Sequence, residues 1–175
     1  MPINDFTEDD WFLISSTPPL IGAVISAADK SGIVGTVKEA IAGLGQAKAA
    51  IEQYPENQLI RSALQGGVSS PDGGIEQARK NKERMFRRMD QQGAHSPLEI
   101  KDQLLVDCRE LRAILDEKGE AEEVAEYLAW AVDIGVKVAE AGREGGILGM
   151  GKGSISEREG AVLAEFLKAL GVMEG

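Results

Sequence analysis

The sequence predicts an all-α fold, a single compact helical bundle of about six to eight helices. Apolar residues recur at helical spacing along most of the chain, and no segment shows sustained alternation of apolar and polar residues. Glycine is abundant, with 21 residues where an average usage of about 7% would give roughly 12. Most of these glycines stand between helical segments. A chain of 175 residues can bury a core without disulfides or metals, so we expect one domain over residues 1–175.

Prolines and capping residues mark the expected helices in the first half of the chain. Pro18 and Pro19 fit the first turn of a helix, where the missing N–H group has no partner to lose. We therefore expect one helix to start at Thr17 and a separate, shorter helix before it, capped by Asn4 or Asp5. The expected elements are the short helix around Trp11 and Phe12, helices over 17–28, 33–54 and 57–65, and an internal loop over 66–74.

Two capping boxes mark helix starts in the second half of the chain. Ser96 is followed three residues later by Glu99, with Pro97 in the first helical position, and Ser156 is followed by Glu159. The expected elements are helices over 75–92, 97–118, 120–141 and 156–170, with a glycine-rich loop over 142–155 between the last two. Helical spacing predicts the core residues Leu104, Cys108, Leu111, Leu115, Val124, Leu128, Ala131, Gly135 and Val138, with Trp11, Tyr127 and Trp130 as aromatic anchors.

Several glycines lie inside expected helices, where the absence of a Cβ atom lets two helices approach closely. They are Gly22, Gly35, Gly43 and Gly135. Residues 146–152 also match the first part of a phosphate-binding loop, G-x-x-x-x-G-K. That motif follows a strand, whereas a helix is expected before this segment. We therefore interpret the glycine-rich loop as a connection between helices and not as a nucleotide site.

The composition excludes several functional classes. A net charge of −10 and a pI near 4.7 argue against general nucleic-acid binding, which requires a basic surface. Cys108 stands alone, which excludes an internal disulfide framework, and His95 is the single histidine. The longest apolar stretch, residues 20–28, is far shorter than the roughly 20 residues of a membrane span. The acidic start of the sequence does not resemble an export signal, so we expect a cytoplasmic protein.

A cluster of basic residues is the strongest candidate for a binding surface. Residues 79–88 hold six basic side chains and one acidic one, a net charge of +5, so the rest of the chain carries about −15. On a helix, four of these side chains share one face: Lys80, Arg84, Arg87 and Arg88. They predict an anionic ligand, a protein partner or the acidic surface of a second copy. The alternative is a solvated helix stabilised by its own Glu76–Lys80 and Glu83–Arg87 pairs.

Four acidic residues form a second candidate site, for a divalent cation. Two stretches of the chain are similar, since 20–29 leads into 37–42 as 134–141 leads into 159–164. In both, a helix of small residues is followed by a glycine turn and a second helix, which indicates either an internal duplication or chance similarity. If the halves pack antiparallel, oxygen ligands suited to a hard cation would converge, namely Asp29, Glu39, Glu140 and Glu159. The alternative is that these acids are ordinary helix-terminal residues.

Three short motifs resemble the TerB-like tellurite-resistance domain. They are ISAADKSG at 25–32, GSISERE at 153–159 and LAEFL at 163–167. That family is all-α and combines Ala-Asp-Gly turns with Ile-Ser-x-x-Glu helix starts. The resemblance implies an all-helical fold and a metal-binding role for Asp29 and Glu159. The basic segment around residue 84 has no counterpart in the family pattern.

The residues do not assemble into a catalytic set. Cys108 falls in an apolar stripe and His95 in a turn, and neither has an identifiable activating partner. We therefore predict a non-enzymatic cytoplasmic protein that acts through protein–protein contact, as a homo-oligomer or with another protein, and that needs no cofactor. The alternative is a TerB-like stress-response module that binds a divalent cation or an anion.

Overall fold

The computed structural model describes residues 5–28, 52–64, 71–93, 96–144 and 156–173, with the side chains of 26, 71–78, 82, 97 and 138–144 left out. Within these ranges the chain forms helices and no strand, which confirms the all-α prediction. The helices are α1 (Glu8–Ala27), α4 (Gln58–Leu64), α5 (Pro71–Gln91), α6 (Pro97–Lys118), α7 (Ala121–Glu144) and α8 (Glu157–Ala169). None of these described helices is long and apolar enough to cross a bilayer.

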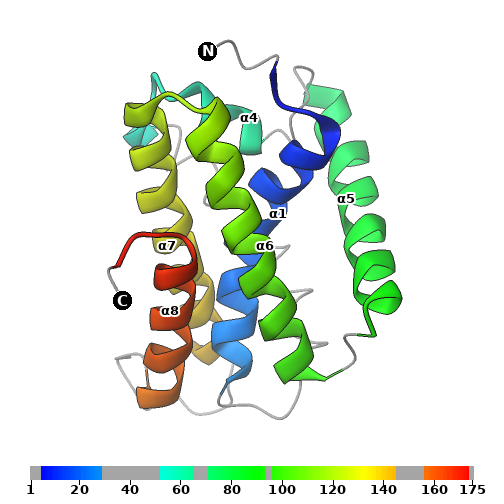
Figure 1. Ribbon diagram of the computed structural model, residues 1–175, viewed down its shortest axis with the longest axis vertical. Helices are drawn as coiled ribbons and strands as arrows, with labels where there is room; N and C mark the ends of the chain where they lie inside the picture. The colour runs from blue at the N-terminus through cyan, green and yellow to red at the C-terminus, as the bar shows by residue number, and fades with distance from the viewer. Residues whose placement is uncertain (1–4, 29–51, 65–70, 94–95, 145–155, 174–175) are drawn as a thin grey trace.

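Helix α1 occupies the centre of the bundle (Figure 1). Its most extensive partner is α7, and α6 crosses it on another side. Helix α8 packs against both α6 and α1, while the short α4 packs on α7. Helix α5 stands at the opposite edge from α7 and is the most peripheral of the described helices (Figure 1).

The expected break between two N-terminal helices is wrong, because α1 is continuous through Pro18 and Pro19. The cap is also different from the predicted Asn4 or Asp5. Thr7 Oγ1 accepts a hydrogen bond from the Asp10 amide at 3.2 Å, and Asp10 Oδ2 accepts one from the Thr7 amide at 2.7 Å. This capping box starts the helix about three turns before the prolines.

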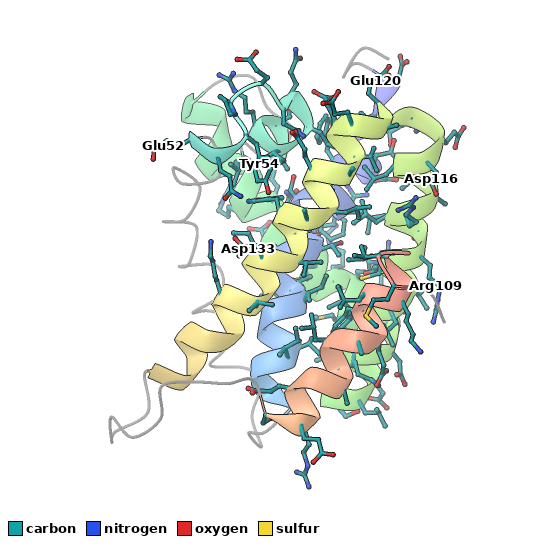
Figure 2. All side chains as sticks on the ribbon, turned by 90° about the vertical axis from the view of Figure 1, so that its left-hand side faces the viewer. Glu52, Tyr54, Arg109, Asp116, Glu120 and Asp133 are labelled. Carbon is teal, nitrogen blue, oxygen red and sulfur yellow. The ribbon has the colours of Figure 1, made fainter. Side chains whose placement is uncertain are left out.

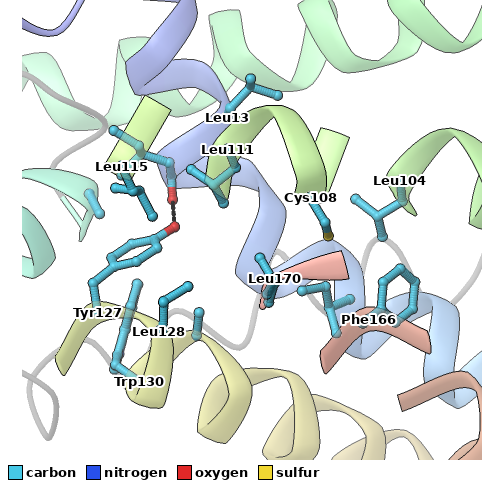
Figure 3. Close-up of a cluster of buried hydrophobic side chains, with 14 of the residues drawn as sticks. Leu13, Leu104, Cys108, Leu111, Leu115, Tyr127, Leu128, Trp130, Phe166 and Leu170 are labelled. Atoms are coloured by element: carbon cyan, nitrogen blue, oxygen red, sulfur yellow. Dashed lines mark hydrogen bonds between the residues drawn. The ribbon is translucent and has the colours of Figure 1, made fainter. Parts of the chain in front are cut away.

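A side chain from α7 compensates for one of the two prolines inside α1. In a regular helix the N–H of residue 18 would bond to the carbonyl of Ile14, and Pro18 has no N–H to donate. The buried Tyr127 hydroxyl donates to the Ile14 carbonyl instead, at 2.6 Å (dashed in Figure 3). The acceptor that Pro18 leaves open is therefore satisfied from another helix, which removes part of the cost of an internal proline.

The starts of α6 and α8 and the ends of α5, α6 and α8 agree with the sequence. Ser96 with Glu99 and Ser156 with Glu159 both form reciprocal capping boxes, with Pro97 in the first turn of α6. Gly93 and Gly171 follow α5 and α8 with φ of 65° and 67°, the left-handed conformation that glycine adopts without strain. Local capping chemistry is sufficient to predict these boundaries because it involves residues close in the chain.

Both expected loops are shorter than predicted. Pro71–Gly74, expected to belong to the loop over 66–74, form the first turn of α5, since proline is compatible with the first helical position. Likewise α7 extends through Glu144, so Gly142 is helical rather than part of the loop over 142–155. Glycine disfavours a helix interior by only about 1 kcal/mol, which does not force a helix to end. Most of the expected 33–54 helix and of the phosphate-loop-like segment lies outside the described residues.

The predicted core stripes are buried where the structure describes them. Leu104, Cys108, Leu111 and Leu115 are buried on α6; Leu104 and Cys108 lie beside Phe166 and Leu170 of α8, and Leu115 lies beside Tyr127 of α7 (Figure 3). Val124, Leu128, Ala131 and Gly135 are buried on α7, and Trp11, Tyr127 and Trp130 are buried as expected. The core thus joins α1, α6, α7 and α8 into one unit.

The crossing of α1 and α7 depends on a glycine. A Cβ atom added to Gly135 would lie 3.0 Å from Ile21 Cγ2 and 3.7 Å from the Gly22 amide nitrogen. The prediction that Gly22 and Gly135 mark a close helix crossing is therefore confirmed. Gly35 and Gly43, which were expected to act similarly, lie outside the described residues.

The Asn57 side chain caps the short helix α4 and also hydrogen-bonds to α7. Its side-chain oxygen accepts from the Ile60 amide at 2.8 Å, which caps α4. Its amide nitrogen donates to the Glu123 carbonyl at 3.0 Å and to Glu126 Oε2 at 2.8 Å, both on α7. One buried side chain thus fixes both the start of α4 and its position on the bundle.

Candidate interaction site around α5

Helix α5 reaches the bundle through side chains, because its backbone lies further from its neighbours than the other described helices lie from theirs. Met85 is buried with 5% of its surface exposed, and Met89 is half-buried. Together with α1 and α6, these methionines enclose a cavity of about 20 Å³. The apolar part of its lining is Phe12, Leu20, Val24, Met85, Met89, Ile100 and Leu104.

Ion pairs between α5 and the bundle surround this apolar contact. The Arg84 guanidinium pairs with Asp9 at the start of α1 and lies 4.9 Å above the Phe12 ring. Arg88 pairs with two carboxylates of α6, at 2.7 Å to Asp107 Oδ1 and 3.3 Å to Glu110 Oε2. The basic helix therefore lies against acidic groups of its own chain.

The structure distinguishes the predicted basic residues by their ion pairs. Arg84 and Arg88 make the ion pairs to α1 and α6, whereas Arg87 is exposed and pairs with none of the described residues. Lys80 is also exposed. An open hollow on the surface is lined by Arg84, Arg87, Arg88 and Gln91. The acids that separate the arginines come from other helices, so helical spacing within α5 could not identify them.

The outward face of α5 carries an aromatic residue among charged ones. Phe86 is 49% exposed. Its exposed neighbours on the helix include Arg79, Glu83, Arg87 and Asp90. Large exposed aromatic side chains and arginines are characteristic of protein interfaces. Helical spacing had placed Met85 and Met89 beside the basic face, but the exposure of Phe86 was not anticipated from the sequence.

The predicted cation site is described at only one of its four side chains. Asp29 and Glu39 lie outside the described residues, as does the side chain of Glu140. Glu159 is 1% exposed, and its Oε2 accepts from the Ser156 amide at 2.9 Å. Among the described residues, no group of three or more metal-binding side chains is close enough to hold an ion. The convergence of the four acids stays a prediction.

Cys108 is a core residue, as predicted. It is fully buried, and burial together with the neighbouring Asp107 charge raises the pKa of its thiol to about 12. The thiolate, which is the reactive form of cysteine, is therefore scarce near neutral pH. His95, the other residue considered for chemistry, lies outside the described residues.

A second hollow lies where the C-terminal end of α6 meets the first turns of α7. Its apolar lining includes Leu115, Val124, Leu128 and Val172. Arg112 borders it, paired with Asp116 at 2.8 Å and donating to the Leu170 carbonyl at 3.4 Å. The polar groups at this hollow are thus already engaged within the chain.

Comparison with known proteins gives no relative for this arrangement. No family model, no curated protein and no solved structure matched the chain. The function is therefore inferred from the geometry and charge of α5 and the helices around it.

Proposed function

We propose that this chain is a non-enzymatic, cytoplasmic helical-bundle protein that acts through protein–protein contact, and that it self-associates through the outward face of α5. The observation that carries the proposal is the composition of this face. Arg87 is exposed and unpaired among the described residues, beside the exposed Phe86. Arginine and aromatic residues dominate the energetics of many protein interfaces.

A second copy supplies a surface of complementary charge. Apart from the basic segment, the chain carries a net charge of about −15. Figure 2 looks onto the side of the bundle that faces away from α5, and four acids are labelled in it: Glu52, Asp116, Glu120 and Asp133. Asp116 pairs with Arg112 and Asp133 with Lys137. The outward face of α5 on one copy would meet this acidic side of the next. Such head-to-tail contacts form rings or open chains of molecules.

The proposal is tested by light scattering across protein concentrations at low and high salt. Contact between exposed opposite charges is screened by salt, so we expect oligomers at low salt and smaller species at high salt. Arg87→Glu should give a monomer at low salt. Arg109→Glu is the matched control, because Arg109 is an exposed arginine of α6 that lies away from α5 (Figure 2). A wild-type monomer in both salts, or equal effects of the two variants, would contradict the proposal.

A further inference from the structure

We infer that the groove of α1 and α6 beneath α5 is a binding surface for a basic amphipathic helix of a partner protein, and that α5 occupies it as an internal competitor. This inference goes beyond the proposed self-association, because it concerns the inward face of α5 and the surface that this face covers. Three observations support it: the chemistry of the groove, the contacts that α5 makes with the groove, and the incomplete packing of α5 against the groove.

The groove has an apolar floor and an acidic rim. Phe12 and Leu20 of α1 and Ile100 and Leu104 of α6 line the floor. The carboxylates of the rim are Asp9 on α1 and Asp107 and Glu110 on α6. Both helices belong to the core of the bundle, since α1 and α6 pack directly on each other. The surface would therefore persist if α5 moved away.

The contacts of α5 define the helix that fits this groove. Arg84 and Arg88 lie one turn apart and meet the rim, and Met85 and Met89 lie one turn apart and meet the floor. A helix with basic residues at i and i+4 and apolar residues at i+1 and i+5 presents the same groups. This is the general mode in which an amphipathic helix binds a groove through a few anchor residues.

The fit of α5 leaves room for competition. The cavity of about 20 Å³ beneath it is large enough for a single water molecule. Arg88 Nε is buried without a hydrogen-bond partner among the described residues, although Arg88 Nη2 is paired with Asp107 and Glu110. The ion pairs, hydrogen bonds and ring contact between α5 and these two helices are made by side chains. A partner helix that fills the cavity and pairs every polar group would gain contacts that α5 does not make.

Weakening α5 should therefore expose the groove to an added helix. The apparent affinity of a covered site falls with the fraction of molecules in which it is open. The probe is a fluorescent peptide of residues 71–92, and binding to the full chain is followed by anisotropy. Met85→Ser combined with Met89→Ser should bind the peptide at least about tenfold more tightly than the wild type.

Charge reversal tests whether the peptide occupies the groove. Asp107→Lys, added to the double methionine variant, should weaken peptide binding at least about tenfold, and an Arg88→Glu peptide should restore it. Glu117→Lys is the control, because it reverses an exposed carboxylate of α6 that does not pair with α5. Arg87 makes no ion pair with the rim of the groove, so Arg87→Glu should leave peptide binding unchanged even where it abolishes self-association.

Either of two results would overturn the inference. One is the absence of peptide binding by a double methionine variant whose circular dichroism shows a folded bundle. The other is binding that does not respond to Asp107→Lys. If the double variant does not fold, Arg84→Gln weakens α5 while keeping its apolar contacts, and the same peptide titration decides between the outcomes.

Discussion

Helix α1 is contacted on two sides in different ways, by α7 and by α5. On the α7 side, Gly135 brings the two backbones together at Ile21, and the buried Tyr127 hydroxyl bonds to the Ile14 carbonyl. On the α5 side, methionine side chains and paired arginines span a wider gap that holds a small cavity. One contact is made close to the backbone, and the other through long side chains.

The difference separates a contact that defines the fold from one suited to exchange. A glycine crossing tolerates little change, because any other residue at Gly135 would place a Cβ atom 3.0 Å from Ile21 Cγ2 and require Ile21 to shift. Arginine and methionine side chains are flexible and tolerate a different partner. We therefore expect substitutions on the α7 side to cost much more stability than substitutions on the α5 side.

The largest loss of folding stability is expected for Gly135→Leu. A leucine side chain cannot fit where even a Cβ atom would lie 3.0 Å from Ile21 Cγ2. Overpacking of this kind costs about 3 kcal/mol or more, measured by urea unfolding. Gly160→Leu is the matched control, since a Cβ atom there meets nothing within 4 Å. Equal stability of the two variants would show that the α1–α7 crossing is not tightly packed.

The second largest effect is expected for Tyr127→Phe. It should lower the free energy of unfolding by about 1–3 kcal/mol, because it leaves the Ile14 carbonyl buried without a donor. Burial raises the pKa of Tyr127 well above its ordinary value, so the hydroxyl keeps its proton and its role as donor at any physiological pH. Pro18→Ala restores an N–H one helical turn beyond Ile14. The loss from Tyr127→Phe should therefore be smaller when Pro18→Ala is present, and strictly additive free energies of unfolding would contradict this explanation.

A smaller, pH-dependent effect is expected at the ion pair between Lys118 and Asp10, which are 2.6 Å apart. Burial alone would raise the pKa of Asp10, but hydrogen bonds from Lys118 and Thr7 outweigh it and lower the pKa. This carboxylate therefore contributes stability above its unfolded pKa of about 3.9 and loses it as the pH falls through the lowered folded value.

Lys118→Gln should accordingly be less stable than the wild type near neutral pH, and the difference should disappear once Asp10 is protonated in acid. The hydrogen bond that Lys118 donates to Asp10 also raises the pKa of Lys118, so this contribution persists up to alkaline pH and is lost only above the ordinary lysine range. Thermal unfolding across pH measures both limits. A difference that stays constant down to the lowest pH would show that the pair does not stabilise the fold.

The smallest effect is expected for Arg88→Gln, on the α5 side. Arg88 is one-third exposed, and pairs of this kind contribute about 0–1 kcal/mol. Gln103 also donates to Asp107 at 2.9 Å, which keeps that carboxylate hydrogen-bonded after the substitution. A loss in urea unfolding as large as that of Tyr127→Phe would place α5 among the elements that define the fold.

The sequence predictions are correct where the interacting groups are close along the chain, and wrong where the groups are far apart along it. The caps at Ser96 and Ser156 were predicted, because each box joins residues only three positions apart. The continuity of α1 was not, because the hydroxyl that satisfies Ile14 lies 113 positions away along the chain. Propensity alone therefore favoured a helix start at Pro18 that the fold overrides.

The same limit applies to the candidate site. The cluster of basic residues on one helix was visible in the sequence, since helical spacing groups them. The separation of Arg87 from Arg84 and Arg88 was not, because it depends on Asp9 and Asp107, which only the packing of α1 and α6 brings to α5.

The sequence by itself determined the helical class, most helix boundaries and the apolar stripes of the core, because periodicity and capping act within one or two turns. The excess of glycine proved to include one residue, Gly135, on which the central crossing depends. Tertiary structure alone decided that α1 continues through its prolines and that α5 turns two arginines inward. In both cases a partner on a distant helix satisfies a carbonyl or a charge, and local sequence carries no record of that partner.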